Sequence, residues 1–202
     1  MENAVNYPGA EKDIARLKEK ASLSEEAFGR ILDIISDEEI KYELKFNDIK
    51  EKDIEYMKKM GVLIKSLKNE VADKFYEHLL KFNKTRNILL SKEGLLEHLK
   101  ITQAAYFEGL FDGIYDRKYF IYRLFVGFAH HSYGVTPSMY IGAYNNYLTI
   151  IWGLLEEELE RGKINLNEIS EFYRSVKKII MLDEYLALET YYSNPFTTIC
   201  PW

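Results

Sequence analysis

Glycine and proline are scarce in this chain of 202 residues, and they lie between long segments whose apolar residues recur every three to four positions. There are 11 glycines and 4 prolines. Apolar residues at this spacing form one stripe along a helix, whereas a half-buried strand needs them at every second position. Helices with short connections bury such stripes by packing on one another. The sequence therefore predicts an all-α fold.

Glycine, proline and helix-capping residues predict where individual helices begin and end. Thr136 followed by Pro137 predicts a helix start, because threonine is a good N-cap and proline fits the first helical turn. Gly113 and Gly134 predict helix ends, and Ser91 is expected to cap the helix that leads to Gly113. The expected helices cover residues 10–21, 24–36, about 47–80 with room for a break before 67, 91–113, 116–133, 137–162 and 167–192.

Composition and charge exclude several classes of protein. The formal net charge is −5 and no Lys- and Arg-rich patch dominates, which argues against nucleic-acid binding. The single cysteine, Cys200, can form neither a disulfide framework nor a cysteine-based metal site. The first residues do not resemble a signal peptide, and the apolar runs are shorter than a membrane span. We expect a cytoplasmic protein with no membrane partner.

Standard catalytic motifs are missing from the sequence. It has no glycine-rich phosphate loop and no Gly-x-Ser-x-Gly turn. The acidic run from Glu156 to Glu158 lies in mid-helix with Arg161 behind it, a pattern typical of a solvated helix face. His78 and His98 have charged neighbours, which favours positions at or near the surface for both.

Two adjacent histidines are the most informative residues for function. His130 and His131 follow a strongly aromatic segment, residues 119–126, in a helix that is apolar almost all round. An imidazole in the apolar, water-poor wall of a pocket is a poor general base and a good axial ligand for a haem iron. Gly127, one turn before His130, leaves room for a flat macrocycle. The alternative is a pair of hydrogen-bonded core histidines, and periodicity does not choose between the two as ligand.

Earlier segments supply polar groups for the opposite side of such a pocket. Phe75 and Tyr76 lie on the apolar face of one predicted helix, and Leu99 and Thr102 lie on that of the next. A buried tyrosine hydroxyl needs a polar partner. Opposite an axial histidine, it can donate a hydrogen bond to oxygen bound at the iron.

Together these motifs resemble the globin-coupled sensor and protoglobin family, the haem-binding sensor globins of bacteria and archaea. The resemblance covers about residues 46–192. It rests on the Phe75-Tyr76 signature, the pair Leu99 and Thr102, the turn Phe111-Asp-Gly113, the spacing Gly127-x-x-His130-x-x-x-Gly134, and the helix start from Pro137 to Tyr140. The doubled histidine matches protoglobins in particular, in which the first histidine binds iron. Met139 departs from the tryptophan that the sensors often have there.

The resemblance implies a globin-like fold with an N-terminal helical extension. Residues 1–45 would form the extension, residues 46–192 the haem domain and residues 193–202 a C-terminal tail. The implied cofactor is haem b, with its iron bound by His130 and with His131 only as a neighbour. The implied haem-binding residues are Phe75, Tyr76, Leu99, Thr102, Val126, Gly127 and Tyr140.

The function implied by the resemblance is reversible binding of a diatomic gas (O₂, CO or NO) in a sensor or carrier, with Tyr76 as the hydrogen-bond donor. One alternative is a haem enzyme that acts on peroxide, nitric oxide or reactive nitrogen species. Another is an interaction module without haem, and His98 is a second candidate iron ligand.

The last two long helices also carry apolar positions that can pair with a second copy of the chain. The resemblance supports such a homodimer. The positions are Tyr144, Leu148, Ile151, Leu155, Phe172, Val176 and Ile180.

Overall fold

The computed structural model describes residues 35–192, and this part of the chain contains helices and no strand, so the all-α prediction is confirmed. None of the helices within residues 35–192 combines the length and the apolar content that a membrane crossing requires. The helices are α3 (Asp37–Phe46), α4 (Glu51–Ser66), α5 (Lys68–Leu80), α6 (Asn83–Leu89), α7 (Leu95–Leu110), α8 (Arg117–Ser132), α9 (Pro137–Glu160) and α10 (Leu166–Tyr192).

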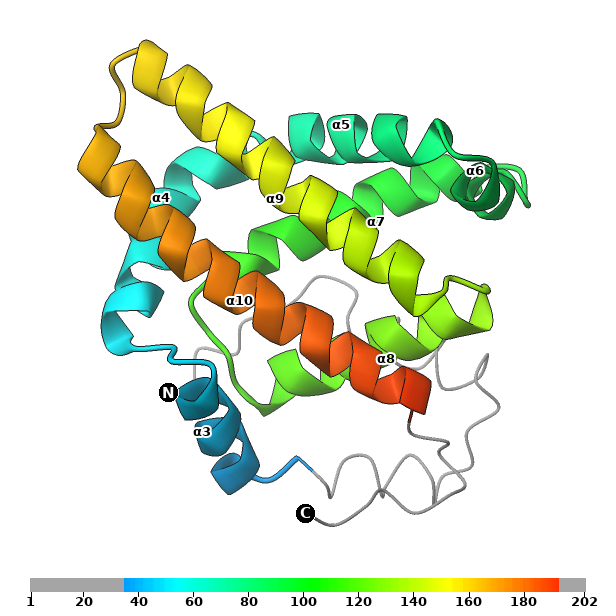
Figure 1. Ribbon diagram of the computed structural model, residues 1–202, viewed down its shortest axis with the longest axis horizontal. Coiled ribbons are helices and arrows are strands. Elements are labelled where there is room, and N and C mark those ends of the chain that lie inside the picture. The colour runs from blue at the N-terminus through cyan, green and yellow to red at the C-terminus, as the bar shows by residue number, and fades with distance from the viewer. Residues whose placement is uncertain (1–34, 193–202) are drawn as a thin grey trace.

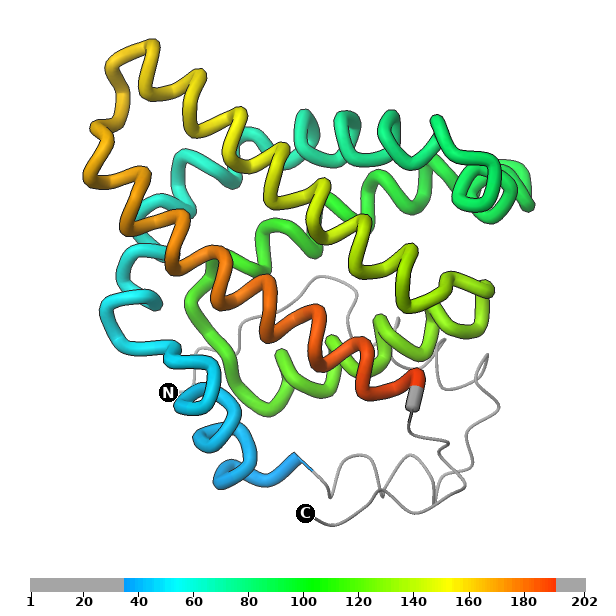
Figure 2. Tube along the Cα trace, viewed as in Figure 1, coloured from blue at the N-terminus to red at the C-terminus, as the bar shows by residue number. Residues whose placement is uncertain are grey.

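The two long helices α9 and α10 lie side by side and antiparallel across the near face of the molecule (Figure 1). Behind them, α5 packs on both α7 and α9, and α8 packs on α10. The tube in Figure 2 shows the short connections that reverse the chain between α8 and α9 and between α9 and α10. These connections leave α5, α7, α8 and α9 grouped around a common space.

The predicted signals around α9 are confirmed. The Thr136 side chain accepts a hydrogen bond from the backbone N–H of Met139, Pro137 is the first helical residue, and Gly134 has a φ of 76°. The prediction for Ser91 is wrong, because α7 begins at Leu95 after Gly94, whose φ of 73° suits glycine. The sequence does not predict α6, because its seven residues are too few to show a periodic stripe.

The apolar core joins α4, α7, α8, α9 and α10. Among its fully buried side chains are Met57, Ile64, Phe107, Phe120, Ile151, Leu155, Phe172, Val176 and Ile180. The last five of these are the α9 and α10 positions that we expected to contact a second copy of the chain. That expectation is wrong for Ile151, Leu155, Phe172, Val176 and Ile180, because the apolar stripes of α9 and α10 are already covered by helices of the same chain.

The predicted N-terminal boundary of the domain lies at helix α3 in the structure. The expected division between residues 45 and 46 falls inside α3, whose Ile40 is buried in the common core. The helix therefore packs on the rest of the protein. The helices expected over residues 10–21 and over most of 24–36 lie outside the described residues, as does the tail of residues 193–202.

Gly127 has a different role from the predicted one. It is buried where α8 meets α10, and a Cβ atom there would overlap the Ala187 carbonyl group and the Thr190 hydroxyl. The missing side chain makes room for a neighbouring helix backbone. It does not make room for a macrocycle.

We expect Gly127→Ala to lower the free energy of unfolding by about 1–3 kcal/mol, because the overlap with α10 outweighs the helix preference of alanine. Gly142→Ala in α9 is the matched control, since no atom lies within 4 Å of the added Cβ. It should stabilise the protein by about 0.5–1 kcal/mol. Urea denaturation followed by circular dichroism measures both, and equal effects would contradict the assigned packing.

Candidate functional site

An apolar cavity of about 590 Å³ lies between α5, α6, α7, α8 and α9. Its size is within the range of pockets that hold small molecules and cofactors, and aromatic and aliphatic side chains form most of its wall. Gly127 is not part of the wall. The other predicted haem-binding and iron-binding residues all line it: Phe75, Tyr76, Leu99, Thr102, Val126, His130 and Tyr140.

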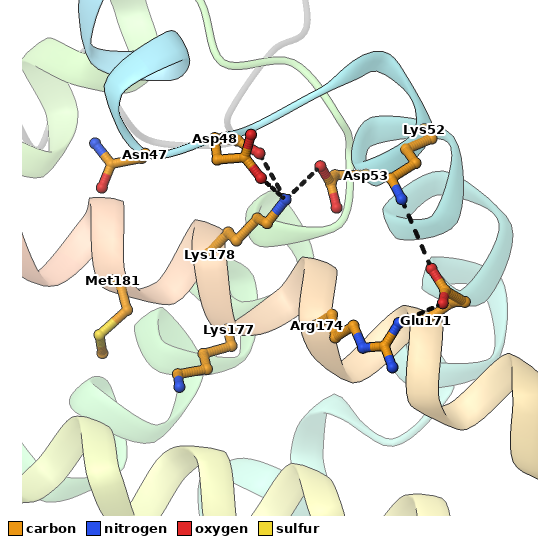
Figure 3. Close-up of a pocket in the computed structure, with 9 residues that line it drawn as sticks. All are labelled: Asn47, Asp48, Lys52, Asp53, Glu171, Arg174, Lys177, Lys178 and Met181. Carbon is orange, nitrogen blue, oxygen red and sulfur yellow. Dashed lines mark hydrogen bonds and ion pairs between the residues drawn. The ribbon is translucent and has the colours of Figure 1, made fainter.

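A second hollow of about 560 Å³ lies where the α3–α4 connection meets α10, and its wall is charged (Figure 3). Lys178 Nζ is 3.0 Å from a carboxylate oxygen of Asp48 and 3.0 Å from one of Asp53. Arg174 pairs with Glu171 at 2.7 Å. The charges within each group of partners neutralise one another, and the Lys178 contacts join the α3–α4 connection and the start of α4 to α10. The apolar cavity is therefore the stronger candidate for a ligand site.

His130 lines the apolar cavity with one ring nitrogen already occupied. Its Nδ1 lies 2.7 Å from the backbone carbonyl oxygen of Val126. Because a carbonyl only accepts, Nδ1 carries the proton and Nε2 carries the free lone pair. Burial lowers the pKa of His130, although the hydrogen bond to Val126 opposes this shift. The ring is therefore neutral at neutral pH and oriented as a metal ligand must be.

The two adjacent histidines have different surroundings. The ring of His130 meets that of Tyr140 edge-on, with the centroids 5.0 Å apart. His131 is exposed, lies beside the ring of Tyr191 and does not line the cavity. Of the two, only His130 has access to a ligand in the cavity.

Helices α5 and α7 contribute the polar groups of another part of the wall. The buried Tyr76 hydroxyl donates to the Leu99 carbonyl oxygen at 3.2 Å, and Thr102 donates to the same oxygen at 3.0 Å. Burial raises the pKa of Tyr76 well above its usual value, so the phenol keeps its proton and remains a donor. His98 lines the cavity too, but it is exposed.

Sequence reasoning missed a buried polar cluster beside the cavity. The Asp183 carboxylate of α10 accepts hydrogen bonds from Tyr106, Tyr119 and Arg123, and its distance to Arg123 Nε is 2.9 Å. Tyr106 also shares a hydrogen bond with Tyr144, and both of these tyrosines line the cavity. The signal that could have revealed the cluster is a charged residue within an apolar helical segment, at Arg123 and again at Asp183.

Helices packed around an apolar cavity, with an imidazole and a phenol in its wall, define the globin class of protein. Comparisons with known proteins identify the family. The family model described as Protoglobin matches residues 36–195, and the chain belongs to this family. The resemblance found from the motifs is confirmed.

Two relatives illustrate the similarity. The chain is 26% identical over 162 residues to the Heme-based aerotactic transducer HemAT of Halobacterium salinarum, with 78% of this chain and 33% of the relative covered. It thus spans about a third of that relative's length. The globin domain of the Geobacter sulfurreducens globin-coupled sensor matches with a TM-score of 0.69 at 23% identity, covering 79% of this chain and 99% of that one, and this confirms the fold.

Membership of a globin family implies a haem cofactor, and the residues present fit one. The neutral His130 ring offers Nε2 as an iron ligand, and the largely apolar wall suits a flat hydrophobic macrocycle. The cavity volume of about 590 Å³ is also adequate for a cofactor.

Proposed function

We propose that this protein binds haem b in the apolar cavity and uses it to bind a diatomic gas reversibly. The observation that carries the proposal is the state of His130, a neutral imidazole in the cavity wall whose Nδ1 is held by Val126. Haem supplies an iron with one coordination position left for O₂, CO or NO. His130 would hold the iron through Nε2, and the edge-on contact with Tyr140 restricts the tilt of its ring.

Tyr76 is the residue that we propose discriminates between gases. Its protonated hydroxyl lies in the cavity wall and donates to the Leu99 carbonyl oxygen, which also accepts a hydrogen bond from Thr102. This hydroxyl would be available to donate a hydrogen bond to O₂ in the cavity, and a donor stabilises a ligand more strongly the more negative charge the ligand carries. CO carries less charge and gains less from the same donor.

Gas sensing is the role that the relatives favour. The Halobacterium relative is named a heme-based aerotactic transducer, and this chain is similar to about a third of it. We propose that the chain likewise reports the gas-bound state of its haem to a partner. Because α8 carries His130 and packs on α10, a movement of α8 on gas binding would pass directly to α10.

The proposed iron ligand can be tested with the two adjacent histidines. The purified wild-type protein should show a Soret band at near-stoichiometric haem, and His130→Ala should abolish the band or reduce it strongly. His131→Ala is the matched control and should keep it, because this side chain does not reach the cavity. Absorption spectra of the ferric and ferrous proteins measure both outcomes. Loss of the band in His131→Ala alone would overturn the assignment.

The proposed donor predicts a selective effect on O₂. Tyr76→Phe should raise the O₂ dissociation rate by about 10–100-fold, the equivalent of losing one buried hydrogen bond, with a much smaller change for CO. Thr102→Val should have a weaker effect, since the Thr102 hydroxyl is held by backbone carbonyls of its own helix. Flash photolysis and stopped-flow measurements give these rates. An unchanged O₂ rate in Tyr76→Phe would refute the assignment.

We further propose a homodimer formed by the exposed faces of α9 and α10. Ile141 and Trp152 are separated by about three turns of α9, and Met181 and Tyr185 by about one turn of α10, so each pair lies on one side of its helix. All four are large apolar or aromatic side chains that remain exposed. Association of two such faces would bury them in a four-helix arrangement.

Trp152→Glu should convert the dimer to a monomer, because it places a charge within the buried interface. Ile101→Glu changes an equally exposed apolar residue on α7 and should leave the dimer intact. Sedimentation velocity at several concentrations distinguishes the two forms. A wild-type monomer at every concentration would contradict the proposal.

A further inference from the structure

A chain of tyrosine hydroxyls leads from the cavity wall to a buried carboxylate. Tyr106 donates its only hydroxyl proton to Asp183 Oδ2, so in the hydrogen bond between Tyr144 and Tyr106 the donor is Tyr144. Tyr140 then donates to Tyr144 at 3.1 Å. Tyr106, Tyr144 and Tyr140 all line the cavity. The protons of three phenols are therefore directed toward Asp183.

Asp183 is surrounded by hydrogen-bond donors and a guanidinium group. It is fully buried, pairs with Arg123 and accepts a further hydrogen bond from Tyr119. The Arg123 guanidinium also lies over the Tyr106 ring, with 3.9 Å between Cζ and the ring centroid. Such a cation disfavours positive charge on that ring. An electron can therefore leave Tyr106 readily only if the hydroxyl proton leaves as well.

Tyr106 has a proton acceptor in place for this loss. Burial raises the pKa of its hydroxyl well above the usual value, so it remains a neutral phenol until it is oxidised. A phenol that has lost an electron is a strong acid, and even a carboxylate paired with arginine accepts its proton. Its ring also forms part of the cavity wall, where it would lie against the cofactor.

We infer that Tyr106 is a redox-active tyrosine, which reduces the cofactor after hydrogen peroxide has oxidised it, with Asp183 as the proton acceptor. The inference rests on the proposed binding of haem in the cavity. It assigns the cavity a second reaction besides gas binding, with hydrogen peroxide as the oxidant.

The reaction balances as follows. Hydrogen peroxide takes up two electrons and two protons and leaves as two molecules of water. Tyr106 and a second tyrosine of the chain supply one electron each and become neutral phenoxyl radicals, and the two protons that they release balance the two that peroxide takes up. At Tyr106 the O–H bond breaks, the electron passes to the oxidised cofactor, and the proton crosses the existing hydrogen bond to Asp183 Oδ2.

The chain contains a matched tyrosine–carboxylate pair away from the cavity. Tyr185 of α10 donates to Glu43 of α3 at 3.4 Å, and neither residue lines the cavity. It has a carboxylate acceptor but no contact with a cofactor. Tyr185→Phe therefore controls for the loss of one tyrosine hydrogen-bonded to an acid.

The experiment mixes the ferric haem-loaded protein with one equivalent of hydrogen peroxide and records the organic radical by freeze-quench electron paramagnetic resonance. The wild-type protein and Tyr185→Phe should give the same tyrosyl signal. Because two tyrosines share the two electrons, Tyr106→Phe should remove about half of it while the Soret band stays intact. Asp183→Asn should slow radical formation by roughly a hundredfold, the lower range of what a positioned proton acceptor contributes.

The outcomes separate this inference from the proposed function. If neither the wild-type protein nor any variant shows a Soret band, the proposed haem binding fails and the inference fails with it. If haem binds but Tyr106→Phe yields as much radical as wild type, only the inference is overturned. Tyr106→Phe keeps the Arg123–Asp183 pair, so the test stands even if Asp183→Asn does not fold.

Discussion

The contact between α8 and α10 is the constraint on which the site depends. At one point Gly127 lets the two backbones approach, and one turn earlier the buried pair of Arg123 and Asp183 joins the same two helices. Removing one partner of such a pair typically costs about 3–5 kcal/mol, because the other charge stays buried and unpaired. His130 follows Gly127 by three residues on α8. The close approach therefore sets the position and orientation of the imidazole relative to the rest of the cavity.

The cavity combines an apolar wall with polar groups that are neutral and fixed. Burial keeps the His130 ring uncharged and Tyr76 protonated, so each is in the form that its proposed role requires. The charges of Arg123 and Asp183, which lie beside the cavity, are paired with each other, and the Arg123 guanidinium is covered by tyrosine rings. A gas molecule bound in this space would receive hydrogen bonds mainly from tyrosine hydroxyls.

Local signals in the sequence predicted local structure well. Thr136 and Pro137 start α9 because capping depends only on adjacent residues, and Gly134 ends the preceding helix for the same reason. The residues expected around the haem also line one cavity, with the exception of Gly127. Apart from the Ser91 cap and the short helix α6, the errors concern which neighbour a residue meets. Ile151 and Phe172 were expected to face a second chain and pack inside their own, because an apolar stripe does not specify what covers it.

The sequence by itself determined the helical class, most helix boundaries and the family, since periodicity, caps and motif spacing are properties of nearby residues. Periodicity left His130 and His131 open and the family resemblance favoured His130, but only the tertiary structure showed which of them lies in the cavity wall, because adjacent helical residues point in directions about 100° apart and the packing selects one. Only the tertiary structure brought Asp183 to Tyr106, 77 positions away in the chain. No local pattern encodes such a contact, because it arises from how α7, α8 and α10 pack together.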